Sequence, residues 1–156
     1  MQNEPLSSPG LALERRAVLS TLAQAKRAEL AEPLAQFWPN LPTRTLRKPE
    51  IGLVMVRGRI GGDGAPFNLG ETTVSRAVIA LETGEHGYGQ VLGRDTQQAR
   101  LIAILDALWQ RDDAREQVEA TVLTPIRTRL SAEKQQKRAE TAATKVDFFT
   151  LVRGED

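Results

Sequence analysis

Two closely spaced arginines in the stretch VMVRGRI have the chemistry to bind an anion. On a β-strand, Arg57 and Arg59 point to one face about 7 Å apart, because successive side chains alternate. Val54, Val56 and Ile60 then take the opposite face. Two guanidinium groups at that spacing can bind a polyphosphate or two carboxylates. The alternative is the solvated face of an antiparallel sheet, which these residues alone favour.

The glycines that follow fit a hairpin turn better than a phosphate-binding loop. The segment GGDGAP lacks the lysine and the serine or threonine of a Walker loop, and no strand-loop-helix unit surrounds it. Glycines at positions 58, 61, 62 and 64 instead allow the positive φ angles of a tight hairpin.

The segment GQVLGRDTQQ is a better candidate for an anion site. A strand ends at Gly93 and a helix begins just after Arg94, so that backbone N–H groups and a guanidinium point toward one place. Asp95 takes the N-cap position and competes for the same N–H groups. In the other reading, Arg94 pairs with a carboxylate.

Other catalytic groups are scarce in this sequence. The chain has no cysteine, which excludes disulfides, thiolate catalysis and an iron-sulfur cluster held by this chain. Its single histidine, His86, lies in the segment ETGEHGY and is expected to be an exposed turn residue. Asp112, Asp113 and Glu116 are expected to form a solvated, charged turn. The residues therefore indicate a binding or scaffolding chain, and we expect it to bind no metal.

Length and composition predict one soluble domain spanning residues 1–156, with residues 1–12 flexible. Lysine and arginine number 21 against 20 acidic residues, so the net charge of +1 gives no general attraction to nucleic acid or to a membrane. No signal peptide or transmembrane stretch is evident, and a cytoplasmic location is the default expectation.

The elements that position these residues are predicted from periodicity. The sequence is helical from Leu11 to Trp38, with Pro33 opening a second short helix, and the three prolines of residues 38–50 predict an extended connector. Strand-forming runs at 51–60, 72–81 and 87–92 predict an antiparallel meander, with PFNL as a possible fourth segment.

Asp95 and Gln98 predict a capped helix that carries apolar residues around most of its circumference. Such a helix is expected to pack on the sheet and on either the N-terminal helices or another chain. Residues 131–145 predict a helical arm whose only apolar residues are alanines, and such a helix is expected either to lie in solvent or to bind a partner. VDFFTLVRG predicts a C-terminal strand, and Phe148 and Phe149 are expected to contact a partner or the home sheet. The fold class is α+β: an antiparallel sheet of three to five strands with N-terminal helices and two long helices after the meander.

The chain resembles the PhnG family, the small G subunits of the bacterial carbon-phosphorus lyase core complex, from about Leu13 to Gly154. The resemblance is carried by GLVMVRGRIGGDGAPFNLGETTVSRAVIAL, GYGQVLGRDTQQARLIAILDAL and VDFFTLVRG. It implies a transferase complex in which a phosphonate displaces adenine from ATP, giving α-D-ribose 1-alkylphosphonate 5-triphosphate. The partners implied are the other core subunits, chiefly the I-type subunit, in which the family places the main nucleosidase-type chemistry.

The same resemblance implies that this chain binds no cofactor of its own. ATP is used with magnesium by the complex, and a separate radical S-adenosylmethionine subunit carries the iron-sulfur cluster. No catalytic residue is carried over, and the isolated chain is expected to be inactive.

Three hypotheses follow. In the first, the chain stabilises the I-type subunit through the apolar helix from Leu101 to Trp109, the arm of residues 131–145 and the terminal strand with Phe148 and Phe149. In the second, Arg57, Arg59, Arg76 or Arg94 contacts the triphosphate or phosphonate directly. A free-standing binding protein for nucleic acid is disfavoured by the near-neutral charge and by only seven aromatic residues.

Overall fold

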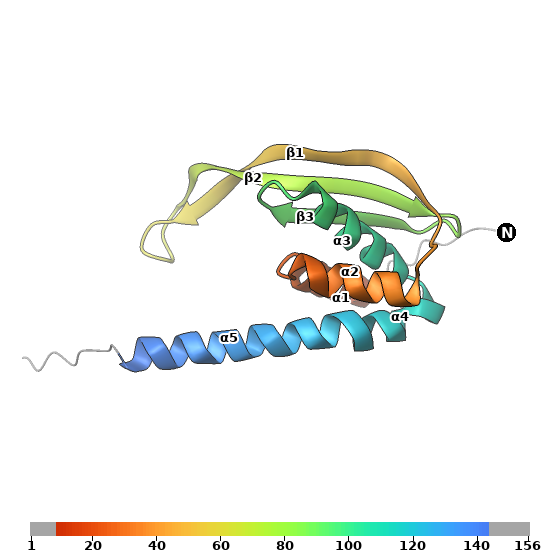
Figure 1. Ribbon diagram of the computed structural model, residues 1–156. Coiled ribbons are helices and arrows are strands. Elements are labelled where there is room, and N and C mark those ends of the chain that lie inside the picture. The colour runs from red at the N-terminus through yellow and green to blue at the C-terminus, as the bar shows by residue number, and fades with distance from the viewer. Residues whose placement is uncertain (1–8, 144–156) are drawn as a thin grey trace, which may run out of the picture.

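The computed structural model describes residues 9–143, which form a three-stranded antiparallel sheet with helices on one side (Figure 1). This confirms the α+β class. Along the chain the elements are α1 (Pro9–Leu22), α2 (Arg27–Phe37), β1 (Thr43–Arg59), β2 (Pro66–Leu81), β3 (His86–Leu92), α3 (Thr96–Trp109), α4 (Asp112–Val118), the π-helical turn η1 (Glu119–Leu123) and α5 (Thr124–Ala143).

The sheet has the order β1-β2-β3, as the meander prediction requires, but its strands differ greatly in length. β3 has 7 residues, whereas β1 has 17 and β2 has 16. Pairing of β2 with β3 stops at Val74 and Leu92, while pairing of β1 with β2 continues to Arg59 and Pro66. Residues 53–73 therefore extend past β3 as a two-stranded hairpin, which we call the ribbon (Figure 1).

Strand β1 begins at Thr43, which corrects the prediction that residues 38–50 are only a connector. Its first half pairs with β2 through two irregularities, between Thr45 and Arg47 and between Arg47 and Glu50. Pro49 falls within the second one. A proline has no N–H to donate, and an irregularity on an edge strand removes the need for that donor. PFNL is likewise the start of β2 and no separate strand.

The N-terminal helices also differ from the prediction. The break lies at residues 23–26, and Pro33 is inside α2 where a helix start was expected. α2 begins early because the side chain of Glu29 accepts a hydrogen bond from the backbone N–H of Lys26 at 2.7 Å, which caps the first turn. This local cap and the burial of Leu30 and Leu34 on either side of Pro33 compensate for the hydrogen bond that the proline cannot make.

Helix α3 lies directly on β3 because two glycines leave room for its backbone. A Cβ atom at Gly87 would lie 1.8 Å from the carbonyl oxygen of Ala103, and one at Gly89 would lie 1.8 Å from that of Ala99. Both distances are far below van der Waals contact. The alternate residues of β3, including Gln90, therefore take the sheet face opposite α3.

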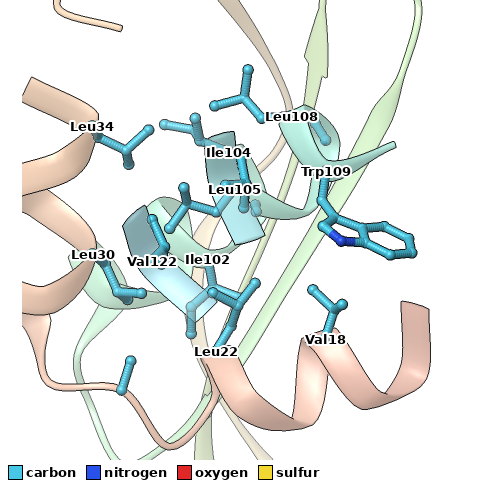
Figure 2. Close-up of a cluster of buried hydrophobic side chains, with 14 of the residues drawn as sticks. Val18, Leu22, Leu30, Leu34, Ile102, Ile104, Leu105, Leu108, Trp109 and Val122 are labelled. Carbon is cyan, nitrogen blue, oxygen red and sulfur yellow. The ribbon is translucent and has the colours of Figure 1, made fainter. Parts of the chain in front are cut away.

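The apolar helix α3 is the centre of the core, and this chain covers it by itself (Figure 2). Side chains of α1, α2 and η1 pack around Ile102, Leu105 and Leu108, which are completely buried. The helix was expected to pack against either the N-terminal helices or another chain, and the structure shows that the N-terminal helices cover it.

After α3 the chain forms a second long helical stretch, as predicted, but it starts earlier than expected. Asp112 and Asp113 lie in the first turn of α4, where carboxylates favour the helix N-terminus, so the expected charged turn is reduced to Gln110 and Arg111. Just before Pro125 the helix widens, and the N–H of Thr124 bonds the carbonyl oxygen of Glu119. The widened turn lies next to Pro125, which has no N–H to donate to the helix.

Candidate functional site

Arg57 and Arg59 lie near the end of the ribbon and are exposed. Gly58, between them, faces the ring of Phe67, so strand alternation places the two arginines on the other face, together with Leu53 and Met55. Arg59 donates to the backbone oxygen of the turn residue Gly64 at 3.2 Å. Arg57 contacts no partner within residues 9–143.

The turn between β1 and β2 is a hairpin, as its glycines predict. Gly61 and Gly62 have φ angles of 63° and 93°, a region that side chains rarely adopt, whereas Gly58 and Gly64 do not have the positive φ that was expected of them.

Arg76 lies in a different place, on the sheet face opposite α3. It pairs in register with Glu50 on one side and with Gln90 on the other. Its Nη2 atom lies 3.4 Å from Oε1 of Glu50, and Nε of Arg47 lies 3.3 Å from that same oxygen. Glu50 and Arg57 are seven residues apart on one strand, or about 23 Å, so the predicted arginines do not form one cluster.

Arg94 is exposed in the turn between β3 and α3 and has no partner in the described part of the chain. Asp95 caps α3 as predicted, accepting the N–H of Gln98 at 2.9 Å. The cation that pairs with Asp95 is Arg27, at 2.7 Å, and not Arg94. Sequence reasoning missed Arg27 because it lies 68 residues away in the chain.

Two other arginines are tied into the fold by bidentate ion pairs. Arg15 holds the fully buried carboxylate of Asp106 at 2.9 and 2.7 Å, and these hydrogen bonds raise the pKa of Arg15. The same carboxylate accepts the backbone N–H of Tyr88 at 2.8 Å. This pair joins α1, α3 and β3, and no spacing in the sequence points to it.

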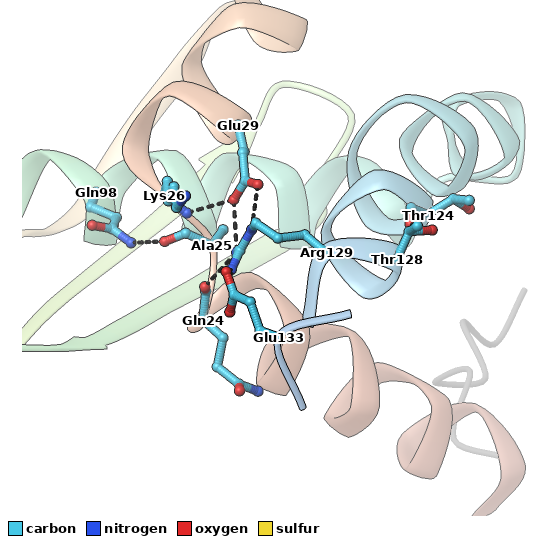
Figure 3. A network of polar contacts seen from close by, with 9 residues as sticks. All are labelled: Gln24, Ala25, Lys26, Glu29, Gln98, Thr124, Thr128, Arg129 and Glu133. Carbon is cyan, nitrogen blue, oxygen red and sulfur yellow. Dashed lines mark hydrogen bonds and ion pairs between the residues drawn. The ribbon is translucent and has the colours of Figure 1, made fainter. Parts of the chain in front are cut away.

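The second bidentate pair joins α5 to α2 (Figure 3). Arg129 binds the two carboxylate oxygens of Glu29 at 2.7 and 2.9 Å, and also contacts Glu133 and the backbone oxygen of Gln24. The hydrogen bonds from Arg129 lower the pKa of Glu29. Arg15 and Arg129 are therefore structural.

Uncovered apolar side chains concentrate on the ribbon. Of the large hydrophobic residues that are exposed within residues 9–143, half belong to it: Leu53, Met55, Val56, Ile60, Phe67 and Leu69. Ile51, just before the ribbon, is also 52% exposed. Strand β1 is basic as well, with five lysines and arginines against Glu50. Apolar surface rimmed by charge is typical of a protein interface.

The second half of α5 is a helix, as predicted for the arm, and residues 131–143 are all exposed. Phe148 and Phe149, and the strand predicted around them, lie outside the described residues. Within those residues no cluster of three or more acidic or histidine side chains is placed to hold a metal. His86 is exposed, as expected, but it is the first residue of β3 and not a turn residue. None of the helices in this part of the molecule is long and apolar enough to cross a membrane.

Comparison with known proteins agrees with the resemblance noted in the sequence. The family model for "Phosphonate metabolism protein PhnG" matches residues 13–154. The "Alpha-D-ribose 1-methylphosphonate 5-triphosphate synthase subunit PhnG" of Rhizobium meliloti (strain 1021) is 52% identical over 143 residues, which cover 92% of this chain and 91% of that protein. The predicted place in phosphonate metabolism is thereby confirmed, and the chain belongs to the PhnG family.

Proposed function

We propose that this chain is the G subunit of a cytoplasmic transferase complex that forms α-D-ribose 1-alkylphosphonate 5-triphosphate from ATP and a phosphonate. The main support is sequence similarity. The chain is 52% identical to the PhnG subunit of an alpha-D-ribose 1-methylphosphonate 5-triphosphate synthase, over nearly the full length of both chains. The isolated chain has no turnover of its own, and the reaction depends on the other subunits, chiefly the I-type subunit.

In this proposal the ribbon is the surface that docks on the partner. Helix α3, the most apolar element, is not available for that role because the chain buries it internally. The ribbon instead exposes Leu53 and Met55 on one face and Phe67 on the other. The free edge of β1 adds unpaired backbone groups, and such an edge can pair with a strand of another chain.

A surface-exposed leucine elsewhere provides the matched control for a docking test. Leu53 on the ribbon is 59% exposed, and Leu13 on α1 is 67% exposed. Each is replaced by aspartate in the chain co-expressed with the other core subunits, and assembly is measured by co-purification and mass. L53D is expected to lose the partner and L13D to retain it. Retention of the partner by L53D would remove the ribbon from the interface.

The reaction itself tests the subunit assignment. The assembled complex should release adenine from ATP when methylphosphonate is present, and omission of this chain should abolish the release. Adenine release by the remaining subunits alone, at the full rate, would contradict the proposal. Release by this chain alone would contradict its dependence on partners.

The alternative is a purely structural assembly factor without substrate contact. It is favoured by the position of Arg57 and Arg59 on the ribbon, beside the apolar side chains that would meet a partner. Replacing Arg57, Arg59, Arg76 and Arg94 one at a time by alanine separates the two functions. Unchanged adenine release by all four intact complexes would leave the structural role alone.

A further inference from the structure

The sheet face opposite α3 carries a compact charged group centred on Arg76. Its neighbours follow from the strand register: Glu50 and Gln90 lie beside Arg76 in one row, and Arg47 lies with Val78 and Tyr88 in the next. Strands β1 and β2 thus bring two guanidinium groups and one carboxylate together, and β3 adds the amide of Gln90. The group carries a net charge of +1, because Arg47 and Arg76 share the single Glu50 carboxylate.

The position of the Arg76 guanidinium depends on a glycine. A Cβ atom at Gly52 would lie 2.7 Å from Nη2 of Arg76, so the guanidinium rests against bare backbone. In this position its Nε is buried without a hydrogen-bond partner. A buried N–H of a charged group without a partner is costly, and a ligand or a moving acceptor can satisfy it.

The contacts to Glu50 are much looser than those of the structural arginines. Both lie at 3.3 to 3.4 Å and both end on one oxygen atom, Oε1. Arg15 and Arg129 instead bind two carboxylate oxygens each, at 2.7 to 2.9 Å, the usual length of a charge-assisted hydrogen bond. Arg47 and Arg76 therefore keep donors that Glu50 does not use.

A cavity of about 540 Å³ adjoins this group. Arg47, Arg76, Tyr88 and Gln90 supply its polar lining. Leu19 of α1 and Ala23 just after it, on the helical side, supply apolar lining, so the cavity passes around the edge strand β3. The volume is in the range of small-molecule sites, and such sites combine apolar walls with a few convergent polar groups.

We propose that Arg47 and Arg76 form a binding site for a phosphate-type dianion carried by a small molecule, with Glu50 as the internal counter-ion that the ligand displaces. A dianion with three oxygens can accept from both guanidinium groups at once and reach the unpartnered Nε of Arg76. The single oxygen Oε1 of Glu50 cannot accept from both guanidinium groups and also reach the Nε of Arg76.

This inference rests on the proposed function only for the source of the dianion, which is either a triphosphate or a phosphonate. Binding is therefore measured on the full-length chain without its partners. Loss of binding would leave the subunit assignment intact, and loss of adenine release would leave the site intact.

The test is calorimetric titration with sodium tripolyphosphate and, separately, with methylphosphonate. Both titrations are made at the same pH and ionic strength, so that the two probes meet the protein with one set of charges and one degree of screening. A triphosphate site is expected to bind the first probe more tightly, and a phosphonate site the second. Failure of the wild-type chain to bind either probe would overturn the proposal.

Three variants locate the binding, and circular dichroism verifies that each is folded. R76A is expected to weaken binding by about tenfold or more, because it removes a charged donor. G52A keeps every charge but moves the guanidinium, and should weaken binding by a smaller factor. E50Q removes the competing charge and should tighten binding.

The matched control is R138A, which removes one exposed arginine from α5. It changes the net charge of the chain as R76A does, and it is expected to leave the affinity unchanged. Equal weakening by R138A and R76A would mean that the anion is attracted by charge alone. Weaker binding by E50Q would contradict the role of Glu50 as the displaced group.

Discussion

The helices and the ribbon of this chain differ in whether their arginines and apolar side chains find partners within the chain. Among the helices, Arg15 forms an ion pair with Asp106 and Arg129 forms one with Glu29. Leu105 and Leu108 of α3 are completely buried. On the ribbon Leu53 and Met55 are more than half exposed, and Arg57 has no partner among the described residues. The first region holds the fold, and the second leaves apolar and charged groups exposed.

The largest expected effect comes from the contact on which the helical layer rests. G89V places a side chain where the backbone oxygen of Ala99 already lies, so α3 must move away from β3. Overpacking of this severity costs about 3 kcal/mol or more, and we expect an unfolded or insoluble chain. Gly10, which has nothing within 4 Å of its Cβ position, supplies the control. G10A should leave the thermal midpoint nearly unchanged; a folded G89V of normal stability would contradict the model of α3 packing.

The buried ion pair should give the next largest effect. R15A leaves the fully buried carboxylate of Asp106 without its cation and is expected to cost about 3 to 5 kcal/mol in urea unfolding. Asp113, whose side chain is 68% exposed, pairs with Arg111 at the surface. R111A should therefore change the free energy of unfolding far less than R15A does. A similar loss of unfolding free energy in R15A and R111A would mean that burial does not make the Arg15–Asp106 pair more important for stability than the surface pair.

One substitution made in both regions tests the comparison directly. Leu105 on α3 is completely buried, whereas Leu53 on the ribbon is 59% exposed. L105A should destabilise the chain by about 2 to 5 kcal/mol, and L53A should stay within about 0.5 kcal/mol. Chemical denaturation of the isolated chain measures both. A large loss in L53A would mean that the ribbon stabilises the chain itself, and its apolar surface would need another explanation.

The smallest effect is a pH dependence. The lowered pKa of Glu29 means that its ion pair stabilises the folded chain above the ordinary pKa of about 4.3, and that this contribution is lost as the pH falls through the lower folded value. E29Q should therefore cost about 1 kcal/mol at pH 6. The difference from the wild-type chain should shrink as the pH falls below about 4. A difference that stays constant down to pH 3 would exclude the carboxylate as its cause.

Local signals predicted much of this fold. The Asp95 cap, the apolar run of α3, the meander and the glycine hairpin all depend on neighbouring residues, and each was recognised. The early start of α2 and the extension of β1 to Thr43 were missed. In both cases prolines suggested a break, but capping and packing in α2 and an edge irregularity in β1 outweighed that preference.

The candidate site was less predictable than the fold. The sequence indicates Arg76 together with three other arginines. Its partners Arg47 and Glu50, and the role of Gly52 beneath it, depend on strand register. An irregularity in β1 shifts that register, so that alternation counted along the sequence does not give the neighbours across the sheet.

By itself, the sequence determined the kinds of elements, their order and the family to which the chain belongs, because these depend on local composition and on motifs. Only the tertiary structure decided which arginines form ion pairs within the described residues and which do not. It also decided that α3 is covered within the chain while the ribbon is not. The reason is physical: an ion pair or an apolar contact joins residues up to 100 positions apart, and its energy depends on distance and burial, which exist only after folding.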